Sequence, residues 1–123
     1  MRIRPPQQEL VLFHAEICQA LADPTRIAIL YELADGPKHV SQIVDALGQP
    51  QPTVSRHLKT LRERGMLRAA REGGHVYYSL TDQRIVEALD LLRAAMGEIL
   101  AGRERLAHAL RDGDSQDGQD RSG

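Results

Sequence analysis

The chain has 123 residues, of which 41% are hydrophobic and 27% charged, and its formal net charge is −1. This length and composition are typical of one small globular domain, and no apolar run approaches the roughly 18 residues that span a bilayer. The first residues lack the apolar stretch of a signal peptide. A single cysteine, Cys18, cannot form an internal disulfide. We therefore expect a cytoplasmic protein that makes no contact with a membrane.

The first half of the chain has the pattern of four short amphipathic helices. Apolar residues recur three to four positions apart, the period of one helix face, over residues 8–21, 24–33, 39–47 and 52–64. Asp23 is predicted to cap the second helix, because an Asp side chain accepts hydrogen bonds from the first free backbone N–H groups. Gly48 and Gly65 are expected to end the third and fourth helices. In the third helix, the residues expected to be buried are Val40, Val44 and Leu47.

After Met66 the period changes to two, because apolar residues then alternate with their neighbours. This pattern predicts two short strands, joined by a turn at Gly73 and Gly74 that permits positive φ. A long last helix follows Thr81 and Asp82. The expected fold is mainly α with a small β-hairpin wing: a winged helix-turn-helix of about five helices and two antiparallel strands. Residues 1–7 are expected to form an N-terminal arm, residues 8–111 the domain, and residues 112–123 a disordered acidic tail.

The fourth helix and the hairpin carry most of the local positive charge. Between Thr53 and Arg71 there are six basic residues and one acidic residue. With Val54, Leu58 and Leu61 inward, the helix presents hydroxyl and cationic groups outward, which suits base edges and phosphates in a DNA groove. His57 lies at the margin and either donates to DNA or packs. The predicted DNA-binding residues are Gln51, Thr53, Ser55, Arg56, His57, Lys59, Arg62, Arg71, Gly73, Gly74, His75 and Tyr77.

Three segments in this order resemble one known family. They are Ala20–Ile27 (ALADPTRI), Gln51–Leu61 (QPTVSRHLKTL) and Gly74–Leu80 (GHVYYSL). Together they resemble the arsenical-resistance-repressor (ArsR/SmtB) family of winged helix-turn-helix regulators. The resemblance implies a homodimer that pairs through its first and last helices and represses a promoter until an inducer releases it.

The apolar seam of the last helix agrees with pairing, because it is longer than one small core requires. The alternative is that the seam only covers the core of its own subunit. The residues predicted at the dimer interface are Phe13, Ile17, Leu89, Leu92, Met96 and Ile99.

The inducer positions of the family are largely changed here. The arsenic-type cysteine positions hold His39 and Ser41, which offer no thiolate. The zinc-type positions hold Asp82, Arg84, Ala95 and Glu98, of which only the two carboxylates could bind a cation. We therefore predict no metal cofactor and leave the inducer unidentified. A site that uses His14, His108 or Glu98 of both subunits, or a small-molecule pocket, remains an alternative. Cys18 is predicted to pack as a small apolar residue and not to act as a sensor.

The function predicted from these features is a repressor that binds an inverted-repeat operator in double-stranded DNA. No catalytic triad order, phosphate-binding glycine loop or metal-ligand cluster indicates an enzyme. The alternative is a winged-helix protein-interaction module without specific DNA binding. Such a module is expected to expose apolar side chains on the fourth helix, where this sequence has polar and basic ones.

Overall fold

The computed structural model describes residues 2–122, with side chains described for residues 2–113. The chain divides into two compact units, Met1–Val86 and Glu87–Gly123. Within the described part, no helix combines the length and apolarity that a membrane span requires.

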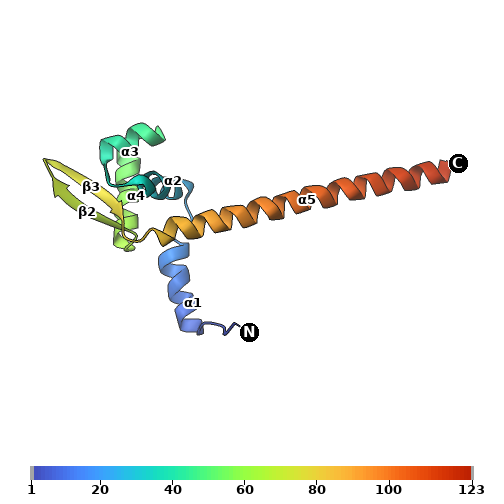
Figure 1. Ribbon diagram of the computed structural model, residues 1–123, viewed down its shortest axis with the longest axis horizontal. Helices are drawn as coiled ribbons and strands as arrows, with labels where there is room; N and C mark the ends of the chain where they lie inside the picture. The colour runs from blue at the N-terminus through green and yellow to red at the C-terminus, as the bar shows by residue number, and fades with distance from the viewer. Residues whose placement is uncertain (1, 123) are drawn as a thin grey trace. The chain divides into compact units, whose positions relative to one another are not determined.

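The first unit contains four α-helices and a small sheet (Figure 1). The helix predicted over residues 8–21 is shorter: α1 spans Gln7–Phe13, and a π-helical turn, η1, continues it over His14–Cys18. Helix α2 spans Pro24–Glu32 and ends in a 3-10 turn, η2, at Leu33–Asp35. Helices α3 and α4 span Val40–Leu47 and Gln51–Glu63.

The predicted helix ends are confirmed at two positions. The carboxylate of Asp23 accepts hydrogen bonds from the backbone N–H of Thr25 at 2.8 Å and of Arg26 at 3.2 Å, so it caps α2. Gly48 ends α3 with φ 64° and ψ 27°, a left-handed conformation that glycine adopts without steric cost.

The core of this unit lies among α2, α3, α4 and the sheet. It contains side chains that are at most 1% exposed: Ile29, Leu30, Leu33, Ile43, Val54, Leu58 and Leu61. The prediction for α3 was wrong, because Ile43 is its buried residue, whereas Val40, Val44 and Leu47 are half-buried. Ile43 lies three residues after Val40 and four before Leu47, so it shares their helix face and is the one side chain of that face that is fully covered.

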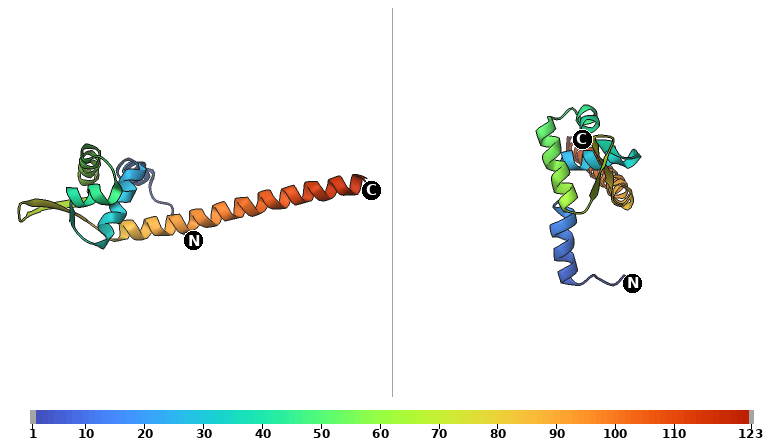
Figure 2. Two further views of the ribbon diagram at one scale, coloured as in Figure 1. Left: turned by 90° about the horizontal axis from the view of Figure 1, so that it is seen from above. Right: turned by 90° about the vertical axis from the view of Figure 1, so that its left-hand side faces the viewer.

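The hairpin pairs β2, Leu67–Glu72, with β3, His75–Leu80, in antiparallel register. Gly73 and Gly74 form the turn with φ 58° and 86°, the two positive angles that a two-residue turn of this hand needs. Figure 2 shows this hairpin extending beyond the helices of the first unit.

The sheet has a third strand that the sequence did not predict. Strand β1, Lys38–His39, pairs antiparallel with β3, so the strand order is β1-β3-β2. Two residues are too few to show an alternating pattern, so this strand gives no periodic signal.

The second unit consists of most of α5, Arg84–Ser122. The helix begins where the carboxylate of Asp82 accepts a hydrogen bond from the backbone N–H of Arg84 at 2.9 Å. The disordered tail predicted over residues 112–123 falls mainly outside the described side chains and stays a prediction.

Candidate DNA-binding surface

Helix α4 separates its side chains into a buried row and an exposed row. Val54, Leu58 and Leu61 are each 0% exposed, and the helix lies against α2 and α3. Because an α-helix has 3.6 residues per turn, the polar residues between these buried positions lie on the opposite face and are exposed to solvent. The exposed residues of this row are Gln51, Ser55, Arg56, Lys59 and Arg62, and Thr53 is half-buried.

A tight turn sets α4 against α3. Gly48 ends the first helix, and Pro50 is the N-cap of the second. Pro52 occupies the first turn of α4, where a backbone N–H would have no partner within the helix. The two helices therefore form a helix-turn-helix, a geometry in which the second helix can enter the major groove.

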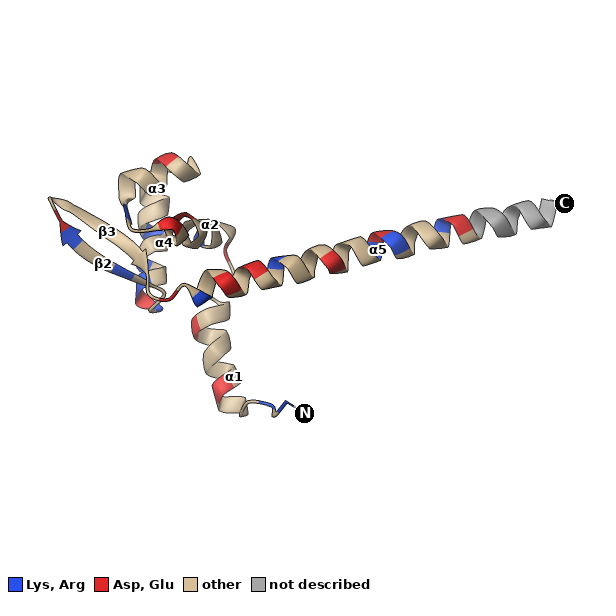
Figure 3. Cartoon of the chain, in the orientation of Figure 1, with Lys and Arg blue, Asp and Glu red and all other residues tan. Residues whose placement is uncertain are grey.

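The hairpin adds further cations beside α4. Figure 3 shows Lys and Arg on β2 as well as on α4, whereas the coloured part of α5 carries both signs. Arg68 and Arg71 are exposed on β2, as are Gly73, Gly74 and His75 at the tip. A projecting basic hairpin of this kind can contact phosphates or a minor groove.

Aromatic contacts join the hairpin to the start of α3. The rings of His39 and His75 stack with centroids 4.5 Å apart and an interplanar angle of 17°. The half-buried Tyr77 meets His39 edge-on at 5.5 Å. These contacts fix the hairpin relative to α3, since stacked and edge-on ring pairs have defined geometry.

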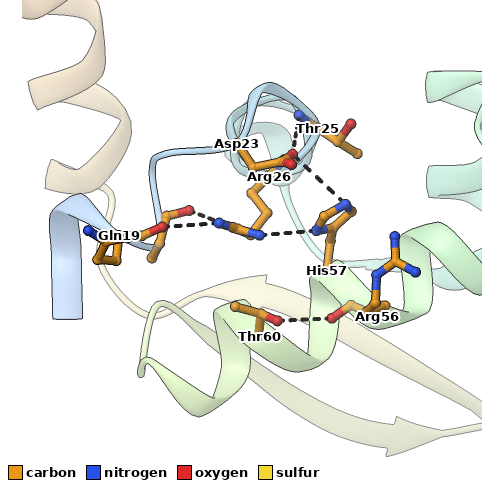
Figure 4. Close-up of polar contacts among 8 residues, drawn as sticks. Gln19, Asp23, Thr25, Arg26, Arg56, His57 and Thr60 are labelled. Atoms are coloured by element: carbon orange, nitrogen blue, oxygen red, sulfur yellow. Dashed lines mark hydrogen bonds and ion pairs between the residues drawn. The ribbon is translucent and has the colours of Figure 1, made fainter. Parts of the chain in front are cut away.

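His57 does not belong to the exposed row. It is 8% exposed, and its ring faces Asp23 and Arg26 in the first unit (Figure 4). Of the two roles left open by the sequence, packing is the one that the structure supports. The signal was its position three residues after Val54 and four before Leu61, which is the spacing of the buried row.

The apolar residues predicted at a dimer interface divide into exposed and buried ones. In α1, Phe13 is 54% exposed, and Ile17 in η1 is half-buried. In α5, Leu92, Met96 and Ile99 are 53–64% exposed. Leu89, by contrast, is only 7% exposed in the single chain, and its place at the interface stays a prediction. Additional exposed apolar side chains that the sequence analysis missed are Leu12, Leu91 and Leu100.

The prediction that Cys18 packs was also wrong, because Cys18 is exposed. The chain leaves the helical path after Cys18, and Ala20, at 1% exposure, enters the core instead.

The zinc-type positions of the family do not fit a cation here. The guanidinium of Arg84 lies 2.6 Å from the carboxylate of Asp82, and its hydrogen bonds lower the pKa of Asp82 to about 2. Ala95 supplies no donor atom. Among the residues whose side chains are described, no three His, Cys, Asp or Glu side chains are grouped so that they could hold a metal ion.

These features together define a winged helix-turn-helix protein with an exposed basic recognition helix. The sequence profile of the "Bacterial regulatory protein, arsR family" matches residues 23–69. Over 79 residues the chain is 43% identical to an uncharacterized HTH-type transcriptional regulator of Methanocaldococcus jannaschii, a match that covers 63% of this chain and 89% of that protein. The chain belongs to the ArsR family, which confirms the resemblance found in the sequence.

Two further relatives agree. The HTH-type transcriptional repressor SmtB of Mycobacterium tuberculosis is 42% identical over 81 residues, 66% of this chain, and the match spans 60% of that repressor's length. A solved homodimeric winged helix-turn-helix DNA-binding domain of Mycobacterium bovis, a possible ArsR-family regulator, is 30% identical. It aligns with a TM-score of 0.66 and covers 81% of this chain and 94% of that one.

Proposed function

We propose that this protein is a transcriptional repressor that binds an inverted-repeat operator in double-stranded DNA as a homodimer. The observation that carries the proposal is the split of α4 into a fully buried apolar row and an exposed row of Ser55, Arg56, Lys59 and Arg62. Hydroxyl and guanidinium groups on a helix of this kind donate to base edges and phosphates in the major groove. No large apolar side chain of α4 is exposed, so a protein-interaction module is the weaker candidate.

The homodimer part of the proposal rests on two exposed apolar surfaces. Helices α1 and α5 each leave large apolar side chains in solvent, and Leu92 is 64% exposed. Burial of a Leu, Met or Ile side chain stabilises an interface by about 1.5–3 kcal/mol each. The similar domain of Mycobacterium bovis is homodimeric, which favours a second copy of this chain as the partner. We expect no enzymatic activity, because the relatives are transcriptional regulators.

We further propose that neither family metal position senses a metal here. The ion pair between Arg84 and Asp82 occupies one zinc-type carboxylate, and His39 stacks on His75 at the arsenic-type position. Micromolar zinc or arsenite should therefore leave the protein on its DNA. Zinc release that Asp82→Asn abolishes would contradict this proposal.

The main proposal is tested by selection of bound sequences from a random DNA pool. The expected product is a palindromic site, because a twofold dimer presents two copies of α4. If about 6 to 10 phosphates are contacted, affinity should fall by about 10³- to 10⁵-fold between about 50 and 200 mM salt. Arg103→Ala, which removes an exposed cation from α5, is the matched control and should select the same site. Failure to enrich any palindrome would contradict the proposal.

A further inference from the structure

A polar cluster connects the recognition helix to the segment that follows η1. Its centre is Arg26, in the first turn of α2, which contacts two other segments of the first unit: residues 19–20 and helix α4 (Figure 4). The guanidinium donates from Nε to the carbonyl of Ala20 at 2.7 Å and from Nη2 to the carbonyl of Gln19 at 3.0 Å. Its third contact is Nη1 to Nδ1 of His57 in α4, at 3.3 Å.

The chemistry of these groups fixes how the His57 ring is used. A guanidinium has only donors, so Nδ1 of His57 must accept, and the proton of the neutral ring then lies on Nε2. That nitrogen faces Oδ1 of Asp23 at 3.8 Å, an electrostatic contact that is too long for a hydrogen bond. The ring is therefore held between a donor on one side and a carboxylate on the other.

Asp23 is itself held in its charged form. Partial burial acts to raise its pKa, but the backbone N–H groups of Arg26 and Thr25, together with electrostatic attraction to His57 and Arg26, outweigh burial and lower the pKa. The same carboxylate thus caps α2 and faces His57. Each member of the cluster orients another, which is the behaviour of a connected polar network.

We propose that Arg26 and His57 are positioning residues for DNA recognition, which set the orientation of α4 relative to the end of η1. His57 lies on the buried row, so it does not touch DNA itself. Base contacts depend on the angle of the helix more steeply than contacts to flexible phosphates do. Loss of the polar cluster should therefore reduce the preference for operator over other DNA and leave non-specific affinity largely unchanged. This inference rests on the proposed function.

The connection also runs toward the proposed dimer interface. The carbonyls of Gln19 and Ala20 follow directly after η1, which continues the exposed apolar helix α1. The polar cluster thus joins α1, which we expect to contact the second subunit, to α4, which we expect to contact DNA. A second link, between Arg64 and Glu16 at 3.3 Å, joins the same elements at the surface, where an ion pair contributes little.

The test uses the full-length chain and compares its Kd for the selected palindrome with its Kd for a scrambled duplex of equal length. His57→Leu and Arg26→Lys should reduce this ratio at least about tenfold and change the Kd for scrambled DNA by less than about twofold. His57→Asn, whose Oδ1 can accept in place of Nδ1, should restore most of the ratio. Glu16→Gln, which removes only the surface link, is the matched control and should keep it.

Thermal melting and sedimentation of each variant separate positioning from folding. An unchanged ratio in folded Arg26→Lys or His57→Leu would overturn the proposal, and so would a His57→Asn variant as defective as His57→Leu. If both Arg26→Lys and His57→Leu fail to fold, the pair is structural and the proposal also falls. A wild type that does not distinguish the two duplexes would instead contradict the proposed function, on which this inference depends.

Discussion

Helices α4 and α5 are both amphipathic, but they bury their apolar residues to opposite extents. In α4 the side chains of Val54, Leu58 and Leu61 are 0% exposed. In α5 the side chains of Leu92 and Met96 are 64% and 53% exposed. A single chain therefore buries these apolar side chains of α4 completely and leaves polar ones in solvent. The two apolar side chains of α5, by contrast, stay exposed in a single chain. The comparison indicates that one chain can form a DNA-contacting face and that two chains are needed to cover the last helix.

The largest expected effect concerns the exposed apolar side chains of α5. Leu92→Asp places a carboxylate in the apolar seam, and burial of an unpaired charge between subunits costs several kcal/mol. The variant should sediment as a monomer, or as an unfolded chain if the subunit is unstable alone. Ala94→Asp is the matched control, because position 94 lies about 200° around the helix from Leu92. A folded Leu92→Asp dimer would mean that this seam is not the interface.

The exposed polar row of α4 is tested by the variant Arg56→Ala. If Arg56 makes a bidentate base contact, its loss should cost about 1–3 kcal/mol of operator binding and relax sequence choice. Arg71→Ala, in the hairpin, is the contrasting variant and should weaken binding to all sequences alike, as loss of a phosphate contact would. Both are measured by titration of operator and scrambled DNA. Wild-type behaviour of both variants would show that the DNA face lies elsewhere.

A smaller effect concerns α2, on which α4 lies. Asp23→Ala removes the N-cap hydrogen bonds to Thr25 and Arg26 and should lower the free energy of unfolding by about 1 kcal/mol. Asp23→Asn keeps an acceptor at the cap and should lose less stability. The measurement is urea unfolding followed by circular dichroism. Equal stability of the Ala variant and wild type would show that the Asp23 cap does not stabilise α2.

The smallest effect lies at the start of α5. Hydrogen bonds from the side chain and backbone of Arg84 lower the pKa of Asp82 to about 2. Because the folded pKa is depressed, the stabilisation is complete above the ordinary carboxyl pKa of about 3.9 and is lost as the pH falls through about 2. The melting temperature of Asp82→Asn should therefore depend less on pH between about 4 and 2 than that of wild type. Identical pH profiles would refute this assignment.

The parts of the fold that follow from local chemistry could be predicted from the sequence. The cap at Asp23, the left-handed Gly48 and the turn at Gly73 and Gly74 each depend on neighbouring residues alone. The exposed row of α4 follows from a clear helical period. Strand β1 could not be predicted, because its two residues are defined only by their pairing with β3.

The errors at the candidate site have a common physical origin. The helical spacing places His57 on the buried row, but its partners Asp23 and Arg26 lie more than 30 positions earlier in the chain, so no local pattern reveals the cluster. Cys18 was assigned from its place in an apolar helical stretch, and the burial of Leu89 was missed because apolar periodicity does not tell whether a helix face is covered by its own chain.

The central claim is that two chains present two copies of α4 in a fixed relation to one operator. It is tested most directly by the affinity of the wild-type protein for the selected palindrome and for the same site with about five base pairs inserted between its halves. Because about 10.5 base pairs complete one turn, the insertion moves one half-site to the opposite face of the duplex. We expect the affinity for the spaced site to fall close to that for scrambled DNA. Unchanged affinity for the spaced site would contradict it.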